Sequence, residues 1–157
     1  MRQYLADIQR ALEPDLPGYT RAFRPPATDE QIAAAEQTLA LSFPEELKEL
    51  YRIHDGETSA HGALPGFRLL SLEELLSAWR DWVGVREDLS QRERDYNVLS
   101  IPPGYVREQY AHRAWLPFAS DSKGTYLAVD LDPGPAGRIG QIISFGRDQD
   151  DHVVVAA

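Results

Sequence analysis

The chain has 157 residues, 43% of them hydrophobic, and its 25 acidic and 16 basic side chains give a formal net charge of −9. This length predicts a single domain over residues 1–157, and no apolar run approaches the roughly 20 residues that span a bilayer. The acidic charge argues against nucleic acid and membrane partners, because phosphate binding needs clustered Lys and Arg. The chain has no cysteine, and the sequence around Asp7 lacks the apolar core of a secretory signal, so we expect a cytoplasmic protein.

The sequence predicts that the chain consists of an N-terminal lead-in, a helix and a proline-rich stretch over residues 1–26, and a core over residues 28–145. Met1 to Leu12 places apolar residues on one helical stripe, and a proline-rich stretch follows up to Pro26. Thr28 and Gln31 have the spacing of a capping box, which predicts the start of a helix. That helix then carries Ile32, Ala35 and Leu39 on one face.

Two more helices are predicted after this one. Pro44 suits a first helical turn, because its missing N–H needs no partner there, and Gly56 is expected to end that helix in the left-handed conformation. Five residues at helical spacing form its expected buried face: Phe43, Leu47, Leu50, Tyr51 and His54. A short apolar run at 67–70 precedes a second capping box, Ser71 with Glu74. The helix that this box opens would bury Leu72, Leu75, Leu76, Trp79 and Val83, and the charged run 86–95 would be its solvated end or a linker.

From Trp115 onward the hydrophobic period changes to two. Four strands are predicted: Trp115 to Phe118, Thr125 to Leu131, Gly140 to Phe145, and His152 to Ala156. The turn residues between them predict consecutive hairpins and therefore an antiparallel meander. Helices first and strands later indicate an α+β fold, with a sheet flanked by helices.

Several residue groups invite a chemical interpretation, and each has a better structural one. His54-Asp55 would need further metal ligands, and His61, His112 and His152 lack the spacing for them. Asp121, Asp130 and Asp132 do not complete a calcium loop, so turn and strand-end roles are preferred. No metal and no cofactor is expected.

The remaining candidates for catalysis are equally weak. Ser120 and Ser122 have no nucleophile elbow, and the acid pairs 45–46 and 73–74 fall in first helical turns, where they favour the helix dipole. Gly134, Gly137 and Gly140 suit a wide hairpin loop better than a dinucleotide site. Trp115 and Phe118 are expected in the core, although exposed aromatic anchors for a partner are the alternative. We therefore expect no catalytic residue and no enzyme.

The order of these blocks resembles the SUKH superfamily, which includes fungal cell-wall assembly regulators and bacterial immunity proteins. The resemblance runs from about Thr28 to Ile143 and implies an antiparallel sheet flanked by helices. Two departures from the family pattern are Thr125 after the turn glycine and the segment 145–148 in place of a His-Asp ending. The residues that match the pattern are expected to define the fold: Pro44, Gly56, Trp115, Pro117, Gly124 and Asp130.

The resemblance implies an immunity protein that binds and neutralises a cognate toxin, here a basic toxin domain attracted by an acidic face. The alternative is a regulatory scaffold module in cell-wall assembly or envelope growth. An enzyme would be indicated by a deep pocket that brings His54, Asp55 and Asp121 together. Acids in predicted loops and at element ends form the candidate partner-binding set: Asp55, Glu57, Asp121, Asp130, Asp132, Asp148, Asp150 and Asp151.

Overall fold

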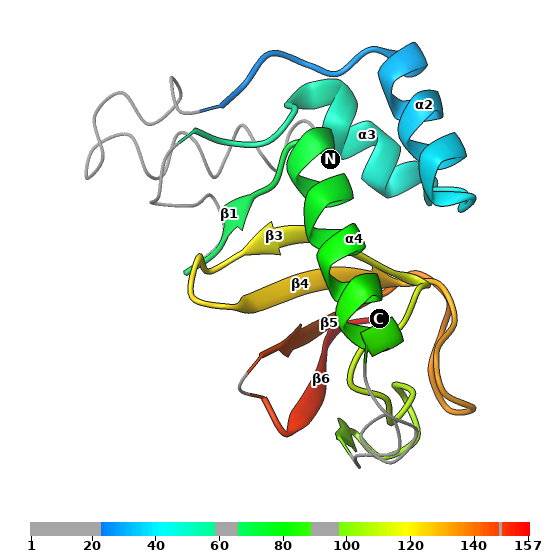
Figure 1. Cartoon of the computed structure of the whole chain (residues 1–157). Helices are drawn as coiled ribbons and strands as arrows, with labels where there is room; N and C mark the ends of the chain where they lie inside the picture. The colour runs from blue at the N-terminus through cyan, green and yellow to red at the C-terminus, as the bar shows by residue number, and fades with distance from the viewer. Residues whose placement is uncertain (1–22, 59–65, 89–97, 148) are drawn as a thin grey trace, which may run out of the picture. The chain divides into compact units, whose positions relative to one another are not determined.

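The computed structural model describes residues 23–58, 66–88, 98–147 and 149–157 (Figure 1). Two compact units divide the chain, residues 1–74 and residues 75–157, and each is described by itself. The helix predicted for Met1 to Leu12 and most of the charged run 86–95 fall outside the described residues. The single domain over residues 1–157 stays a prediction.

The first helix described in the first unit is α2 (Asp29–Leu39). The capping box is confirmed, because the Thr28 hydroxyl accepts the Gln31 N–H at 3.3 Å and the Gln31 side chain accepts the Thr28 N–H at 2.8 Å. Three apolar residues of this helix are buried, as the spacing predicts: Ile32, Ala35 and Leu39.

Helix α3 (Glu45–Ile53) follows, and its N-cap is Pro44. The Pro44 carbonyl accepts the first two intrahelical N–H groups, those of Leu47 and Lys48. Leu47 and Tyr51 are buried, whereas Leu50 and His54, both predicted on the buried face, are only half-buried. The predicted stop at Gly56 is wrong: α3 ends at Ile53, and His54 caps it in an extended conformation (φ −149°, ψ 130°).

Strand β1 (Arg68–Leu69) occupies the predicted apolar run, and helix α4 (Leu72–Asp88) begins directly after Ser71. The second capping box is confirmed within the first unit. The Ser71 hydroxyl accepts the Glu74 N–H at 3.2 Å, and the Glu74 carboxylate accepts the Ser71 N–H at 2.8 Å. Along α4 the buried residues are Leu72, Leu75, Ala78 and Val83. Leu76 and Trp79, which were predicted to be buried, are only half-buried, and the small side chain of Ala78 is buried instead.

The second unit contains a sheet whose strands lie in the order β3-β4-β5-β6-β2. Their bounds are β2 (Leu99–Ile101), β3 (Trp115–Ser120), β4 (Thr125–Asp130), β5 (Gln141–Gly146) and β6 (Asp151–Ala156). The antiparallel hairpins from β3 to β6 are confirmed, as is the α+β class. β2 was not predicted, and it pairs with β6 in parallel.

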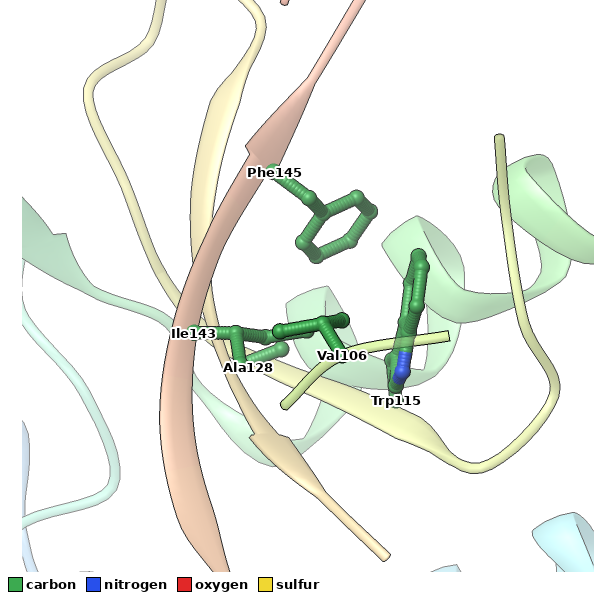
Figure 2. Close-up of a cluster of buried hydrophobic side chains, with 5 residues drawn as sticks. All are labelled: Val106, Trp115, Ala128, Ile143 and Phe145. Atoms are coloured by element: carbon green, nitrogen blue, oxygen red, sulfur yellow. The ribbon is translucent and has the colours of Figure 1, made fainter. Parts of the chain in front are cut away.

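One face of this sheet carries the hydrophobic core of the second unit. Figure 2 shows the side chains of Phe145, Ile143 and Ala128 extending from their strands toward the side on which Val106 and Trp115 lie. Trp82 of α4 packs edge-on against Phe145, with ring centroids 5.1 Å apart. Trp115 and Phe118 are 2% and 8% exposed, so both are core residues rather than exposed anchors.

Candidate functional site

Three acids of the candidate set lie at one end of the sheet of the second unit. The β3–β4 and β5–β6 turns meet there, because the Arg147 N–H donates to the Gly124 carbonyl at 3.1 Å. Asp121 belongs to the first turn, and Asp150 and Asp151 stand where β6 begins. We call these three residues the acidic end.

The Asp121 carboxylate organises the turn in which it lies. It accepts the N–H groups of Lys123 at 2.7 Å and Thr125 at 2.9 Å. Partial burial acts to raise the pKa of Asp121, but these hydrogen bonds together outweigh burial and hold the pKa below its usual value. The carboxylate therefore remains ionised at the pH of the cell.

Asp132 lies at the opposite end of the sheet, in the loop between β4 and β5. Its carboxylate pairs with Arg107 at 2.6 Å and stands 3.4 Å from the Nε2 atom of His112. The hydrogen bond from Arg107 is the main reason that the pKa of Asp132 is lowered. Because its charge is matched by a neighbouring cation, Asp132 adds less to an acidic face than the acidic end does.

Asp130, also in the candidate set, is fully buried, so it does not line a surface in this structure. Its two carboxylate oxygens accept the Asp132 N–H and the Gln141 side-chain amide, both at 3.0 Å. The Gln141 amide also donates to the Tyr105 carbonyl at 2.8 Å, so a polar network links the two ends of the β4–β5 loop to residue 105. Burial is the largest influence on Asp130, and it raises the pKa despite these hydrogen bonds.

Two further candidates, Asp55 and Glu57, belong to the first unit and are engaged by its backbone. The Asp55 carboxylate accepts the Leu72 N–H at 2.8 Å. Glu57 is fully buried, and its carboxylate accepts the Leu69 N–H at 2.7 Å, so Glu57, like Asp130, does not line a surface. Asp148 falls outside the described residues.

The residues expected to define the fold occupy special backbone positions. Pro44 caps α3, as described above, and Gly56 and Gly124 have φ of +79° and +115°. Pro117 lies beside a register shift between β3 and β4, where a residue without an N–H is tolerated in a strand. That these positions define the fold across the family stays a prediction.

The groups considered for chemistry have local partners as well. His54 stacks on Phe23 with ring centroids 4.4 Å apart, and the Ser120 hydroxyl accepts the Ser122 N–H at 3.0 Å. Within the described ranges, no group of three or more His, Asp or Glu side chains is placed to hold a metal ion. In the same part of the chain, no helix is both long and apolar enough to cross a bilayer.

One surface feature was missed by the sequence analysis. Four apolar residues of β2 and β6 are exposed, and we call them the apolar strip: Leu99, Ile101, Val153 and Val155. Between them, Ser100 and His152 are buried. The alternation of His152 with valines was visible in the sequence, but a period of two does not say which set of side chains faces inward.

Comparison with curated proteins finds relatives in fungi. The chain is 33% identical to "Cell wall assembly regulator SMI1" of Saccharomyces cerevisiae, over 83% of this chain and 32% of the relative. It is 37% identical to "Cell wall biosynthesis/cell cycle regulator smi1" of Schizosaccharomyces pombe, over 83% of this chain and 28% of the relative. A third relative, the "Glucan synthesis regulatory protein" of Neurospora crassa, is 33% identical over 77% of this chain and 29% of its own length. The chain thus spans about a third of the length of these relatives.

These names correct the function that the resemblance first suggested. The relatives are regulators of cell-wall assembly and glucan synthesis, so the hypothesis of an immunity protein that neutralises a toxin is wrong, and so is the basic toxin domain as partner. The alternative, a regulatory role in cell-wall assembly, agrees better with these comparisons.

The model of the SMI1 / KNR4 family (SUKH-1) matches residues 26–157, which include the whole range from Thr28 to Ile143 that carried the resemblance. The match covers most of the chain. The chain therefore belongs to the SMI1 / KNR4 family (SUKH-1).

Proposed function

We propose that this chain is a regulatory module in cell-wall assembly that acts by binding another protein and not by catalysis. The observation that carries the proposal is the family match over residues 26–157, together with relatives named as regulators of cell-wall assembly and glucan synthesis. Because the chain spans about a third of those relatives, the proposal concerns the module that they share. A cytoplasmic location stays a prediction from the sequence.

The charge of the surface supports a protein partner with a basic contact region. The net charge is −9, and the acidic end gathers Asp121, Asp150 and Asp151 where two turns meet. Long-range attraction of this kind raises the rate of association more than the final affinity. The same charge repels nucleic acid phosphates, which supports a protein as the partner.

A chimera tests the regulatory role. The segment of the Saccharomyces cerevisiae relative that aligns with this chain is replaced by residues 26–157, and growth is measured under cell-wall stress in cells lacking the native regulator. We expect growth to be restored well above that of cells carrying a chimera with Gly56→Val, which is expected not to fold. A stably folded chimera that gives no more growth than an empty vector would overturn the proposal.

Charge reversal tests the role of the acidic end in binding. The chain is used to capture partners from cells, and the association rate of each captured protein is measured with wild type and with Asp150→Lys/Asp151→Lys. We expect the double variant to associate about tenfold more slowly at low salt, with a flatter salt dependence. Glu49→Lys/Asp81→Lys, which reverses two exposed acids on α3 and α4, is the matched control and is expected to change the rate by less than about threefold. Equal slowing by both variants would assign the effect to net charge and not to the acidic end.

A further inference from the structure

Strands β2 and β6 expose apolar side chains on one face and bury polar ones on the other, where Val154 also packs against the core. Polar Ser100 and His152 are 4% and 1% exposed, whereas their apolar neighbours in the same strands face outward. The exposed fractions of the apolar strip are 55% for Leu99, 44% for Ile101, 38% for Val153 and 56% for Val155. A row of exposed apolar side chains on a sheet leaves a surface that another molecule can cover.

The register places the strip on one face. Ile101 pairs with Val153, and Leu99 pairs with Asp151, so these four side chains stand on the same side of the sheet. Val155 follows Val153 at the next outward position. Ser144 of β5 pairs with Val153 and is half-buried, so it borders the strip on its inner side. The strip is therefore two parallel rows of apolar side chains at the edge of the sheet.

The size of the strip favours a short segment over a globular partner. Four half-exposed aliphatic side chains present on the order of a few hundred Å² of apolar surface. A stable interface between two folded domains buries about 800 Å² on each partner. Side chains along each row repeat about every 6.6 Å, which matches the spacing of alternate residues in an extended chain.

The charge near the apolar strip indicates which kind of molecule could bind there. Asp151 stands in line with Val153 and Val155, and exposed Asp150 precedes it, so one end of the strip is negative. Lys123 and Arg147 lie on the turns at that end of the sheet, but Asp151 is the charged group in the row itself. A second copy of the chain would bring another net charge of −9 to this surface, which disfavours self-association.

We propose that the apolar strip, together with Asp151, binds an extended segment of a partner protein. The segment carries apolar residues at alternate positions and a Lys or Arg that meets Asp151. This inference rests on the proposed function, because it assigns a surface and a chemical class to the partner of the module. The apolar residues supply affinity by leaving water, and the ion pair sets the direction and position of the segment.

The test uses the full chain and a fluorescein-labelled peptide, Lys-Lys-Ile-Ser-Val-Ser-Ile, with binding measured by fluorescence anisotropy. We expect Val153→Thr/Val155→Thr to weaken binding by about tenfold or more, because threonine keeps the shape and strand preference of valine but replaces a methyl group with a hydroxyl. Leu99→Thr is expected to weaken binding as well. Ile139→Thr is the matched control, since Ile139 is 75% exposed in the β4–β5 loop, and it should bind within about twofold of wild type. Thermal unfolding confirms that each variant is folded.

The charge element is tested with Asp151→Asn and with a peptide in which Glu-Glu replaces Lys-Lys. We expect Asp151→Asn to weaken binding of the Lys peptide by about threefold, and the Glu peptide to bind at least about tenfold more weakly than the Lys peptide. Equal binding of the two peptides, or strip variants that bind like wild type, would overturn the proposal.

Two other occupants give distinct results. If deletion of residues 1–22 raises the peptide affinity more than about tenfold, a segment of this chain covers the strip, and the proposal is wrong. If sedimentation shows a dimer that Val153→Thr/Val155→Thr abolishes, a second copy covers it, and the proposal is again wrong. If strip variants still capture the same proteins from cells as wild type, only the strip proposal fails. The proposed function fails instead when the chimera described above does not support growth.

Discussion

The Asp55 carboxylate accepts the backbone N–H of Leu72 at 2.8 Å, which ties the corner after α3 to the first residue of α4. The first N–H groups of a helix have no intrahelical partner, so a side-chain acceptor from a distant residue satisfies one of them. Ser71 and Glu74 satisfy two others through their capping box. Asp55, which looked in sequence like half of a metal-binding pair, is thus part of a helix start in the first unit.

We expect Asp55→Ala to lower the free energy of unfolding by about 1–2 kcal/mol, because the Leu72 N–H loses its acceptor. Asp55→Asn keeps an amide oxygen at the same place and should cost about half as much. The measurement is equilibrium urea unfolding of the full chain at neutral pH. Equal losses for the two variants would show that the charge of Asp55 matters and its hydrogen bond to Leu72 does not.

A position can require glycine because its φ is positive or because neighbouring backbone lies too close for a Cβ, and Gly56 and Gly66 allow these two reasons to be compared. They have nearly the same φ, +79° and +80°, but a Cβ at Gly56 would clash with the backbone nitrogen of Ser71, whereas a Cβ at Gly66 would meet nothing within 4 Å. We expect Gly66→Ala to cost about 1 kcal/mol through strain alone. Gly56→Ala should cost more than about 3 kcal/mol, because backbone must move. Thermal unfolding compares the two, and similar losses would exclude the close approach as the main cause.

Asp130 predicts a pH dependence of stability. Burial raises its pKa above the usual 3.8, so the folded state keeps the proton over a range in which the unfolded state has released it. The contribution of Asp130 to stability therefore falls as pH rises from about 3.8 through the raised pKa. Asn at this position cannot titrate, so the difference in unfolding free energy between wild type and Asp130→Asn should become smaller as pH rises over that range.

At neutral pH, Asp130→Asn is still expected to destabilise the fold, by about 1–3 kcal/mol. The new amide group would face the Gln141 amide, and Gln141 cannot simply rotate because it also donates to Tyr105 and accepts the Arg138 N–H. Urea unfolding at several pH values measures both effects. A difference between the two proteins that stays constant with pH would contradict the raised pKa.

His152 predicts a pH dependence of the opposite sign. Its Nε2 atom lies 2.7 Å from the Gln109 carbonyl and must donate to it, and burial is the main cause that lowers the pKa below its usual 6.5. As pH falls from about 6.5 to the lowered pKa, the unfolded state binds a proton that the folded state refuses, so stability is lost on acidification.

His152→Phe removes this titration while keeping an aromatic ring against Trp115. At pH 8 we expect the variant to be less stable by about 1–2 kcal/mol, because the Gln109 carbonyl loses its donor. At pH 5 the difference should shrink or reverse, since only the wild type then loses stability because its unfolded state binds a proton at this histidine. Urea unfolding at pH 5, 6.5 and 8 checks this, and an unchanged difference would refute the lowered pKa.

Much of the local structure could be predicted from sequence because its causes are local. The capping boxes at Thr28 and Ser71 depend on residues three positions apart, and the strands at 115–156 depend on a period of two with turn residues between them. The candidate site was less predictable. Sequence placed Glu57 and Asp130 in the candidate partner-binding set, although both are fully buried, because an acid near the end of a predicted helix or strand carries no local sign of the backbone N–H that will meet it.

The sequence by itself determined the helices α2, α3 and α4, the hairpin order and the family of this protein, since short-range spacing and the order of motifs specify all of them. Only the tertiary structure decided that β2 lies parallel beside β6, and that His152 and Ser100 face inward while Val153 and Ile101 face outward. The physical reason is that a strand has two faces with the same period, and the choice between them is made by what packs against each face. For β6 that choice buried a histidine against Trp115 and left valines at the surface.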